Sequence, residues 1–418
     1  MTSLRERFDD AATTAPPSRL SSRAVYAAAW RRRRARQRWA AAAAGGLTAL
    51  VVAAVVAVAG NRAPQSGPAG TDSPPPPAPT TTGTTAVPAV GIQGPMAGEG
   101  KHLYVQWAPF QCENMSKYGC PGRLLGSDDN GATWTARYSG IVDDITAPAP
   151  GVVLAHFDGE SIDVKHVSTD GGRTWKLVRP VGGAVGTVPA GGWAICTDER
   201  REQDYTGPYR CGLRGVDPRT GEARMLANQP GVRPDTVLST PVGAGLWVGG
   251  TAPDGHLGLA VSHDGGQTWR TRLFAETDPA DPGIVSVATV DGTSAYAVVT
   301  TGQPRRVLMY RTTDGGQTWT TADPEHTVPY KDHGQDTYLA ADGTHVIRTV
   351  HEKLAEWYAG KDGTYRAPAP VTGLAEHDGF WPVLTAAPGR YLTNDLTALY
   401  TSPDGLHWTR LPVAVPPG

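Results

Sequence analysis

Several signatures of catalysis are missing from this chain of 418 residues. It has only four cysteines and no Cys-x-x-Cys pair, and its eleven histidines show no paired spacing, so we predict no metal site and no cofactor. The phrases Gly-x-Ser-x-Gly and His-Glu-x-x-His and a glycine-rich phosphate loop are also absent. The sequence therefore offers no motif of a serine hydrolase, a zinc protease or a nucleotide-binding enzyme, and we predict no catalytic residue.

Positive charge is scarce after the first 38 residues. Residues 1–38 hold ten arginines against three acidic residues, a net charge of +7. The whole chain has a net charge of −2, so the residues beyond 38 carry −9. Binding of nucleic acid by the folded part would need a basic surface. We therefore predict no nucleic-acid partner.

An uncharged segment follows the arginine-rich tail. Residues 39–60 carry no charge, and about 20 apolar residues suffice to span a bilayer. Arginines at positions 31–34, 36 and 38 precede it, and such a cluster stays in the cytoplasm, where it can face anionic lipid. The pattern predicts a single-pass cell-membrane protein with residues 1–38 in the cytoplasm. A signal peptide cleaved after Ala59 and a twin-arginine export signal are the alternatives.

Residues 61–88 are rich in proline and threonine. Such a segment cannot bury a core, so it predicts an extended, disordered stalk. The stalk would hold the rest of the chain, residues 89–418, away from the outer side of the membrane. The bias toward alanine, arginine and proline is typical of a GC-rich actinobacterium.

Residues 89–418 contain a repeated phrase. Each copy has Ser or Thr, then Asp, a glycine turn, Thr or His, and Trp at nearly constant spacing, and the copies end at Trp134, Trp175, Trp269, Trp319 and Trp408. Neighbouring copies lie 41 or 50 residues apart, and the wider gaps of 94 and 89 residues are about two periods each. A period in the forties built from short strands predicts a β-propeller with one four-stranded blade per repeat.

The residues of this phrase suit a turn between two strands. Glycine supplies the positive φ of a tight connection, and the Asp and Ser or Thr side chains can hydrogen-bond the amides of the turn. The tryptophan then opens the next strand as a buried plug. We predict a structural role for these tryptophans and for the five aspartates, Asp129, Asp170, Asp264, Asp314 and Asp404.

A second repeated feature gives the number of blades. A glycine turn followed by an apolar strand occurs seven times, at residues 98–100, 150–151, 191–192, 243–245, 291–292, 342–343 and 388–389. Two weakened copies of the first phrase, at 216–221 and 360–365, fall where the period requires them. Both features predict seven blades, and six blades with an irregular insert is the alternative. The sequence leaves the closure of the ring open: the first strand lies near residues 90–93 and the last at 408–411, an arrangement that allows blades 7 and 1 to pack side by side.

All four cysteines lie in the predicted propeller. An even number of cysteines in an exported domain indicates disulfides, with a metal site as the alternative. Of the three possible connectivities, the local pairs Cys112–Cys120 and Cys196–Cys211 are the most economical. Each pair would staple the hairpin between the second and third strands of its blade, in blades 1 and 3.

The two stapled hairpins, 108–122 and 197–209, are the longest insertions in the repeat and emerge on the face opposite the repeated turns. Long loops on a rigid scaffold often carry binding sites, and their mixed charged and aromatic residues suit a glycan, a cell-wall polymer or a protein. Solvated loops that need disulfides because of their length are the alternative. The candidate binding residues are Phe110, Glu113, Lys117, Tyr118, Arg123, Arg200, Arg201, Asp204, Tyr205 and Tyr209.

The repeated phrase resembles the Asp-box, or BNR repeat, of the sialidase-like β-propellers. The resemblance implies a site in which three arginines hold a substrate carboxylate, a Tyr–Glu couple acts as nucleophile and an Asp acts as acid and base. The first of those arginines stands in an Arg-Ile-Pro phrase in the family, and this sequence has no such phrase. The arginines that remain therefore receive no catalytic role; they are Arg305, Arg306, Arg311, Arg348 and Arg390.

The sequence also resembles photosystem-assembly-type and sortilin-like propellers, which act by binding. We therefore predict a membrane-anchored extracellular propeller that acts as a binding or scaffold module. The alternatives are a sialidase-like exo-glycoside hydrolase and an extracytoplasmic sensor that signals through residues 1–38. Three arginines and a Tyr–Glu pair converging on the central cavity, opposite the Asp-boxes, would identify the hydrolase.

Overall fold

The computed structural model describes most of the residues after position 89. The described residues are 90–109, 122–158, 160, 164–198, 211–238, 240–241, 243–302, 305–322, 328, 335–351, 354–361, 363–374, 383–387, 389–395 and 398–416. The predicted cytoplasmic tail, membrane span and stalk lie outside them. Across the described ranges, no helix is long and apolar enough to cross a membrane.

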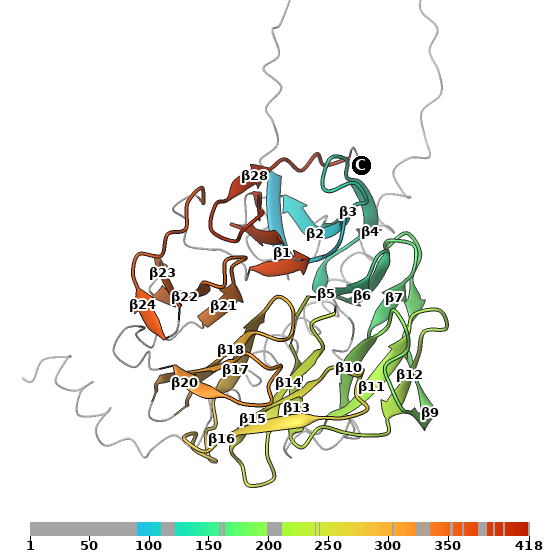
Figure 1. Cartoon of the computed structure of the whole chain (residues 1–418). Helices are drawn as coiled ribbons and strands as arrows, with labels where there is room; N and C mark the ends of the chain where they lie inside the picture. The colour runs from blue at the N-terminus through green and yellow to red at the C-terminus, as the bar shows by residue number, and fades with distance from the viewer. Residues whose placement is uncertain are drawn as a thin grey trace, which may run out of the picture. The chain divides into compact units, whose positions relative to one another are not determined.

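The described residues form 28 strands in seven four-stranded sheets, arranged as blades around a ring (Figure 1). The strands of blades 1 to 4 are β1 (Val90–Glu99), β2 (His102–Pro109), β3 (Arg123–Ser127), β4 (Thr135–Ser139), β5 (Val142–Ala149), β6 (Val152–Phe157), β7 (His166–Ser168), β8 (Lys176–Leu177), β9 (Arg179–Val185), β10 (Trp193–Asp198), β11 (Cys211–Asp217), β12 (Glu222–Leu226), β13 (Arg233–Val237), β14 (Leu246–Thr251), β15 (Leu257–Ser262) and β16 (Arg270–Phe274). Those of blades 5 to 7 are β17 (Ile284–Thr289), β18 (Ala295–Thr300), β19 (Val307–Thr312), β20 (Thr320–Ala322), β21 (Gln335–Leu339), β22 (His345–His351), β23 (Leu354–Lys361), β24 (Thr364–Arg366), β25 (Leu384–Ala387), β26 (Arg390–Asn394), β27 (Leu399–Ser402) and β28 (Thr409–Leu411). The protein is an all-β, seven-bladed β-propeller, as predicted, and the six-bladed alternative is wrong.

The apolar core lies between neighbouring blades. Between blades 4 and 5, for example, Trp247, Phe274 and Tyr310 pack together with the apolar faces of both sheets and are almost completely buried. Side chains alternate between the two faces of a strand, so each blade contributes to an interface on either side. Burial of such a side chain stabilises the folded state by about 1.5–3 kcal/mol, and this packing joins the separate sheets into one ring.

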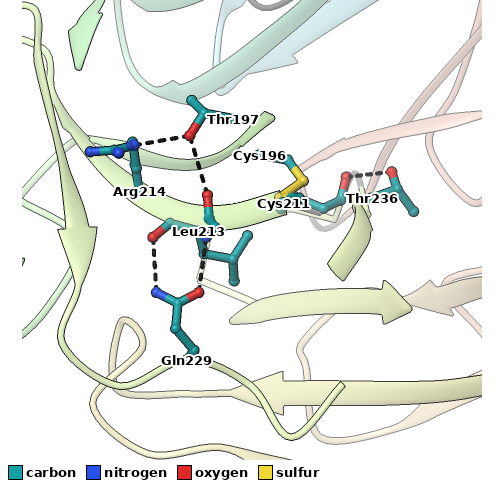
Figure 2. Close-up of a disulfide and its surroundings, with 9 residues drawn as sticks. Cys196, Thr197, Cys211, Leu213, Arg214, Gln229 and Thr236 are labelled. Atoms are coloured by element: carbon teal, nitrogen blue, oxygen red, sulfur yellow. Dashed lines mark hydrogen bonds between the residues drawn. A yellow bond between two sulfur atoms is a disulfide. The ribbon is translucent and has the colours of Figure 1, made fainter. Parts of the chain in front are cut away.

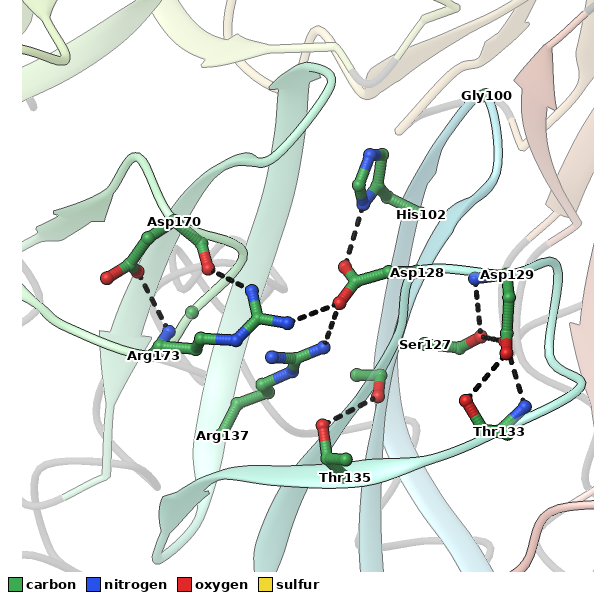
Figure 3. Close-up of polar contacts among 12 residues, drawn as sticks. Gly100, His102, Ser127, Asp128, Asp129, Thr133, Thr135, Arg137, Asp170 and Arg173 are labelled. Atoms are coloured by element: carbon green, nitrogen blue, oxygen red, sulfur yellow. Dashed lines mark hydrogen bonds and ion pairs between the residues drawn. The ribbon is translucent and has the colours of Figure 1, made fainter.

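The Asp-boxes form closely similar turns between the third and fourth strands of their blades. In the first copy, the Ser127 hydroxyl accepts a hydrogen bond from Gly131 N (2.7 Å) and donates one to Asp129 Oδ1 (2.8 Å). Asp129 also accepts bonds from the Thr133 amide (2.8 Å) and hydroxyl (2.6 Å), as Figure 3 shows. The same four bonds recur in the copies of Asp170, Asp264 and Asp314.

These bonds occupy the carboxylates within their own turns. The Thr318 side chain and amide, together with the Thr312 hydroxyl, donate to Asp314 and hold its pKa at about 2. The carboxylate is therefore charged at neutral pH and engaged by the residues of the Asp-box itself.

The fifth copy replaces the threonine by histidine and keeps the turn. His407 N lies 2.8 Å from Asp404 Oδ1, and His407 Nδ1 lies 2.6 Å from Asp404 Oδ2. The two weakened copies also occupy the expected place. Residues 216–221 connect β11 to β12, where Asp217 accepts a bond from Arg219 N (2.9 Å), and residues 360–365 connect β23 to β24. The repeat thus locates the turn between the third and fourth strands, counted in sequence order, of all seven blades.

A network of charges joins the turns of blades 1 and 2 (Figure 3). Asp128 contacts His102 Nδ1 (2.8 Å), the buried Arg137 (2.6 Å) and the half-exposed Arg173 of blade 2 (2.5 Å). Partial burial alone would raise the pKa of Asp128, but the bonds from these three side chains outweigh it and lower the pKa well below its usual range. The ionised Asp128 therefore links two neighbouring blades.

Blades 1 and 7 close the ring by packing side by side. Each consists of strands that are consecutive in the sequence, and they exchange no described strand. The residues after β28 continue onto blade 1, where the Trp134 indole donates to Pro412 O (3.3 Å) and Arg123 donates to Pro416 O (2.9 Å). Packing of whole blades side by side, which the sequence allowed, is therefore how the described strands close the ring.

Blade 3 departs from the predicted arrangement. Its strand order from the inside outward is β10, β11, β12, β9, and β9 pairs in parallel with β12 at the outer rim (Figure 1). The glycine turn at 191–192 follows the first strand of its blade in sequence, but that strand lies at the outer rim of the blade and not at its inner edge. Most side chains of β9 are exposed. The strand also contains Pro180 and two glycines, which suit an edge better than a buried position.

Candidate binding site

A central funnel of about 390 Å³ lies between the inner strands of six blades. The described residues that line it are Met96, 143–145, Leu238, Thr240, Pro241, 286–289, 336–338 and 383–385. They belong to blades 1, 2, 4, 5, 6 and 7, and most are aliphatic or carry hydroxyl groups. A concave site of this volume falls within the range of ligand pockets.

Three aspartates gather at one end of the funnel. Asp143 and Asp144 stand near the start of β5, and Asp336 stands near the start of β21. The end of each inner strand lies beside the Asp-box turns, as shown by the bond from Gly171 N to Gly151 O just after β5. The aspartates therefore lie toward the opposite face, where the second strands end and the predicted stapled loops begin.

Each of the three carboxylates is more exposed than its basic partner. Lys165 Nζ is 2.7 Å from Asp144 Oδ2, and His156 Nε2 is 3.7 Å from Asp143 Oδ2. Asp144 is 62% exposed and Asp143 is 39% exposed, whereas Lys165 is 19% exposed. Asp336 is paired with an arginine of β22, which is buried. The surface that a ligand meets is therefore acidic.

The arginines considered for a sialidase-like clamp do not converge on this funnel. Its described lining contains no arginine and no glutamate. Arg348 is the buried partner of Asp336. Arg311 lies over the ring of Tyr296, 5.7 Å from the centroid, and Arg390 binds residues of blade 1 on the Asp-box side.

Of the candidate binding residues in the stapled loops, the structure describes Arg123. It begins β3, its guanidinium carbon lies 5.9 Å from the centre of the Trp107 ring, and it donates to Pro416 O. Arg123 thus holds the last described residues against blade 1. The other candidates and the Cys112–Cys120 pair lie outside the described residues and stay predictions.

The Cys196–Cys211 disulfide is present, as predicted. It joins β10 to β11 with the Cα atoms 5.4 Å apart (Figure 2). In the same hairpin, Leu213 N donates to Gln229 Oε1 (2.9 Å), and Gln229 Nε2 donates to Leu213 O (3.1 Å). The Gln229 side chain therefore takes the place of a strand on the outer side of β11, beyond the end of β12.

A second cavity of about 420 Å³ opens beside the funnel at blade 3. Residues of β5 and β6 form one wall, β13 forms the other, and β10 lies between them; Asp144 lines both cavities. Where six blades present an inner strand to the centre, blade 3 presents its second strand.

Sequence reasoning missed the second cavity and the funnel aspartates. The glycine turn at 191–192 predicts that β10 follows, but it carries no information on where β9 lies. A signal for the aspartates exists in the sequence: Asp143 and Asp144 are two adjacent acidic residues near the start of β5, and such a pair is placed to line the opening.

Comparisons with known proteins identify the repeated phrase. A family model described as BNR/Asp-box repeat matches residues 166–177 and 260–271. No curated protein matches the chain in sequence. Among solved structures, YCF48 from Cyanidioschyzon merolae is 18% identical over 65% of this chain and 80% of that one, with a TM-score of 0.33.

Two further solved structures that are similar to this chain are a propeller domain of a protease and a sialidase. The β-propeller domain of the Trilobed protease from Pyrococcus furiosus is 10% identical over 77% of this chain and 95% of that one, with a TM-score of 0.44. Trypanosoma rangeli sialidase is 11% identical over 77% of this chain and 54% of that one, with a TM-score of 0.35. Likeness at this level says nothing of activity. The chain is a seven-bladed β-propeller that carries BNR/Asp-box repeats.

Proposed function

We propose that this protein is a non-catalytic binding module whose ligand carries cationic groups. The observation that carries the proposal is the described lining of the funnel, with three aspartates toward one end and neutral side chains elsewhere. A sialoside carboxylate would meet like charge there, which is unfavourable. An amine or a guanidinium would instead find several carboxylate acceptors and form charge-assisted hydrogen bonds.

Hexalysine is a suitable probe because its side chains carry only primary amines. Calorimetric titration of the full-length protein should give saturable binding that weakens as salt is added. The triple variant Asp143→Asn, Asp144→Asn, Asp336→Asn should bind at least about tenfold more weakly, which corresponds to about 1.4 kcal/mol.

A matched control variant removes three negative charges at positions outside the funnel. Asp254, Asp278 and Asp291 lie in turns that do not line the funnel, and their replacement by Asn should leave hexalysine binding within about twofold of the wild type. Equal losses in the two triple variants would mean that the net charge of the protein, rather than the funnel, attracts the probe.

The hydrolase alternative is tested on the same preparations. We expect the wild-type protein to release no fluorophore from a fluorogenic sialoside. Release that is present in the wild type and lost in the funnel variant would overturn the proposal of a non-catalytic module, as would the absence of hexalysine binding.

The binding module is further proposed to stand outside the cell, anchored by residues 39–60. The support is the uncharged sequence of that segment and the Cys196–Cys211 disulfide, because disulfides persist in oxidising compartments. Alkaline carbonate should fail to extract the full-length protein from membranes and should extract a variant that lacks residues 39–60. A soluble product that begins after Ala59 would show that the segment is cleaved instead.

A further inference from the structure

The geometry points to β10 as an acceptor strand for a peptide. We propose that an extended segment of a partner protein, with alternating apolar and basic residues, binds along β10 as the inner strand of blade 3. This inference rests on the proposed function, and it names both the class of ligand and the place where the ligand binds.

One edge of β10 has no strand beside it. In the part of the chain that the structure describes, β10 is the first strand of its sheet and pairs with β11 alone. In the other blades an inner strand covers the second strand, as β5 covers β6 and β13 covers β14. A strand edge of this kind offers a row of backbone donors and acceptors, and an extended peptide can extend the sheet by pairing with it.

The hydrogen bonds of Leu213 show which backbone groups face the open edge. Leu213 directs its N–H and C=O to Gln229, on the side away from β10. Leu213 stands opposite Cys196 in the antiparallel ladder, so these two residues form a non-hydrogen-bonded pair. Cys196 must then direct its own N–H and C=O away from β11. Because the pattern alternates along the strand, Ala194 and Asp198 do the same.

The cavity of about 420 Å³ lies along this edge. It is flanked by β5 and β13, the inner strands of the neighbouring blades, and Ile145, Ile195 and Val237 supply apolar lining. A strand placed there would have a blade on either side, like the six inner strands that are present. Its side chains would alternate between the two blades, so apolar residues at every second position would pack on one wall, on Ile145 of β5 or on Val237 of β13.

The charges around the cavity select basic residues for the remaining positions. Asp144 and Asp235 line the cavity, and Lys165 is the one basic residue among its described lining residues and already contacts Asp144. The adjoining funnel adds Asp143 and Asp336. Lysine or arginine side chains of the bound segment would reach this acidic region.

Hydrogen exchange of the full-length protein, resolved to single amides, tests whether the edge is open. The amides of Ala194, Cys196 and Asp198 should exchange at least about 100-fold faster than those of Ile195 and Thr197, which bond to β11. Protection of all five amides in the isolated protein would mean that another segment of this chain already pairs with β10, and that result would overturn the proposal.

The binding test uses the peptide acetyl-Lys-Val-Lys-Val-Lys-Val-amide. At saturation it should slow exchange at Ala194 and Cys196 at least about tenfold and leave Ile195 unchanged. The same peptide with glutamate in place of lysine should bind at least about tenfold more weakly, since it meets like charge. Binding of both peptides with equal affinity would contradict the selection for basic residues.

Two tryptophan variants locate the site. Thr236 is exposed and lines the side cavity, so Thr236→Trp should fill the cavity and abolish the protection of β10 by the peptide. Thr320→Trp places the same side chain at an exposed position of β20 that lines neither cavity, and it should retain the protection. Thermal unfolding of both variants verifies that they are folded.

The outcomes separate this inference from the proposed function. If hexalysine binds and the Val–Lys peptide leaves the β10 amides unprotected, the acceptor strand is wrong and the cation-binding funnel stands. If hexalysine does not bind at all, the proposed function itself fails. Equal peptide binding by the wild type and the Thr236→Trp variant would likewise exclude the side cavity as the site.

Discussion

Five hydroxyl groups hold the Asp-box turns from the buried side. Each accepts a hydrogen bond from a turn glycine and donates one to the aspartate two residues later; they belong to Ser127, Ser168, Ser262, Thr312 and Ser402. All five side chains are almost completely buried. The repeat therefore keeps a hydroxyl at this position because both the amide and the carboxylate of the turn depend on it.

Replacement of one such hydroxyl should destabilise the protein measurably. In Ser262→Ala, the Gly266 amide loses its 2.8 Å acceptor in a buried place, which costs about 1–3 kcal/mol of unfolding free energy. Ser262→Thr is the matched control, since blade 5 uses threonine at this position, and it should cost less than half as much. Urea denaturation measures both; an Ala variant as stable as the Thr variant would contradict the role of the hydroxyl.

A buried histidine should make the stability depend on pH. His345 is completely buried, its ring stacks 4.2 Å from that of Tyr296, and its Nδ1 lies 2.5 Å from the Tyr365 hydroxyl. Burial lowers the pKa of His345 from 6.5 to about 3. Between these values the unfolded chain binds a proton that the folded protein does not, so stability falls as the pH decreases, by up to about 1.4 kcal/mol per pH unit.

The variant His345→Gln isolates this contribution. Urea denaturation at pH 7, 6 and 5 should show a smaller loss of stability per pH unit in the variant than in the wild type, because glutamine does not titrate. The variant is also expected to be less stable at pH 7, so the comparison concerns the slope and not the absolute value. Identical slopes would mean that other groups set the acid sensitivity.

At the scale of strands, the sequence predicts what is local and misses what depends on distant partners. The turn between the third and fourth strands is local, because Asp, Gly and Thr act within a few residues of one another, and all seven such turns are correctly placed. The position of β9 depends on β12, which comes much later in the sequence. The two strands pair in parallel, with Arg179 opposite Glu222. The funnel site could not be predicted from the sequence for the same reason. Asp143 and Asp336 belong to different blades and line one funnel only when the ring closes.

The hairpin of β10 and β11 should depend on its disulfide. The disulfide closes a loop of 15 residues. A cross-link over a loop of that length lowers the entropy of the unfolded chain and so stabilises the folded state by about 3 kcal/mol. The double variant Cys196→Ala, Cys211→Ala should therefore unfold at a lower temperature than the wild type, without reductant in either sample. The single variant Cys196→Ala should lose a similar amount. An unchanged melting temperature in the double variant would mean that packing alone holds this hairpin.

At the scale of the whole propeller, the ring is closed by packing and by the residues that follow the last strand. Because blades 1 and 7 exchange no described strand, the interface between them depends on side-chain packing and has no backbone ladder of its own between described strands. Val413 and Val415 pack against the cluster that contains Trp134 and β1. This segment therefore acts as a strap from blade 7 to blade 1.

Removal of the strap should weaken the closure of the ring. A chain that ends after Leu411 loses the half-buried Val413 and Val415 and the bond from Trp134 to Pro412 O, which together contribute about 2–4 kcal/mol. We expect a lower urea midpoint and, because Trp134 becomes more exposed, a red shift of tryptophan fluorescence in the folded protein. A chain that lacks only residues 417–418 is the control and should match the wild type. If both truncated chains unfold like the wild type, the side-by-side packing of blades 1 and 7 is sufficient to close the ring.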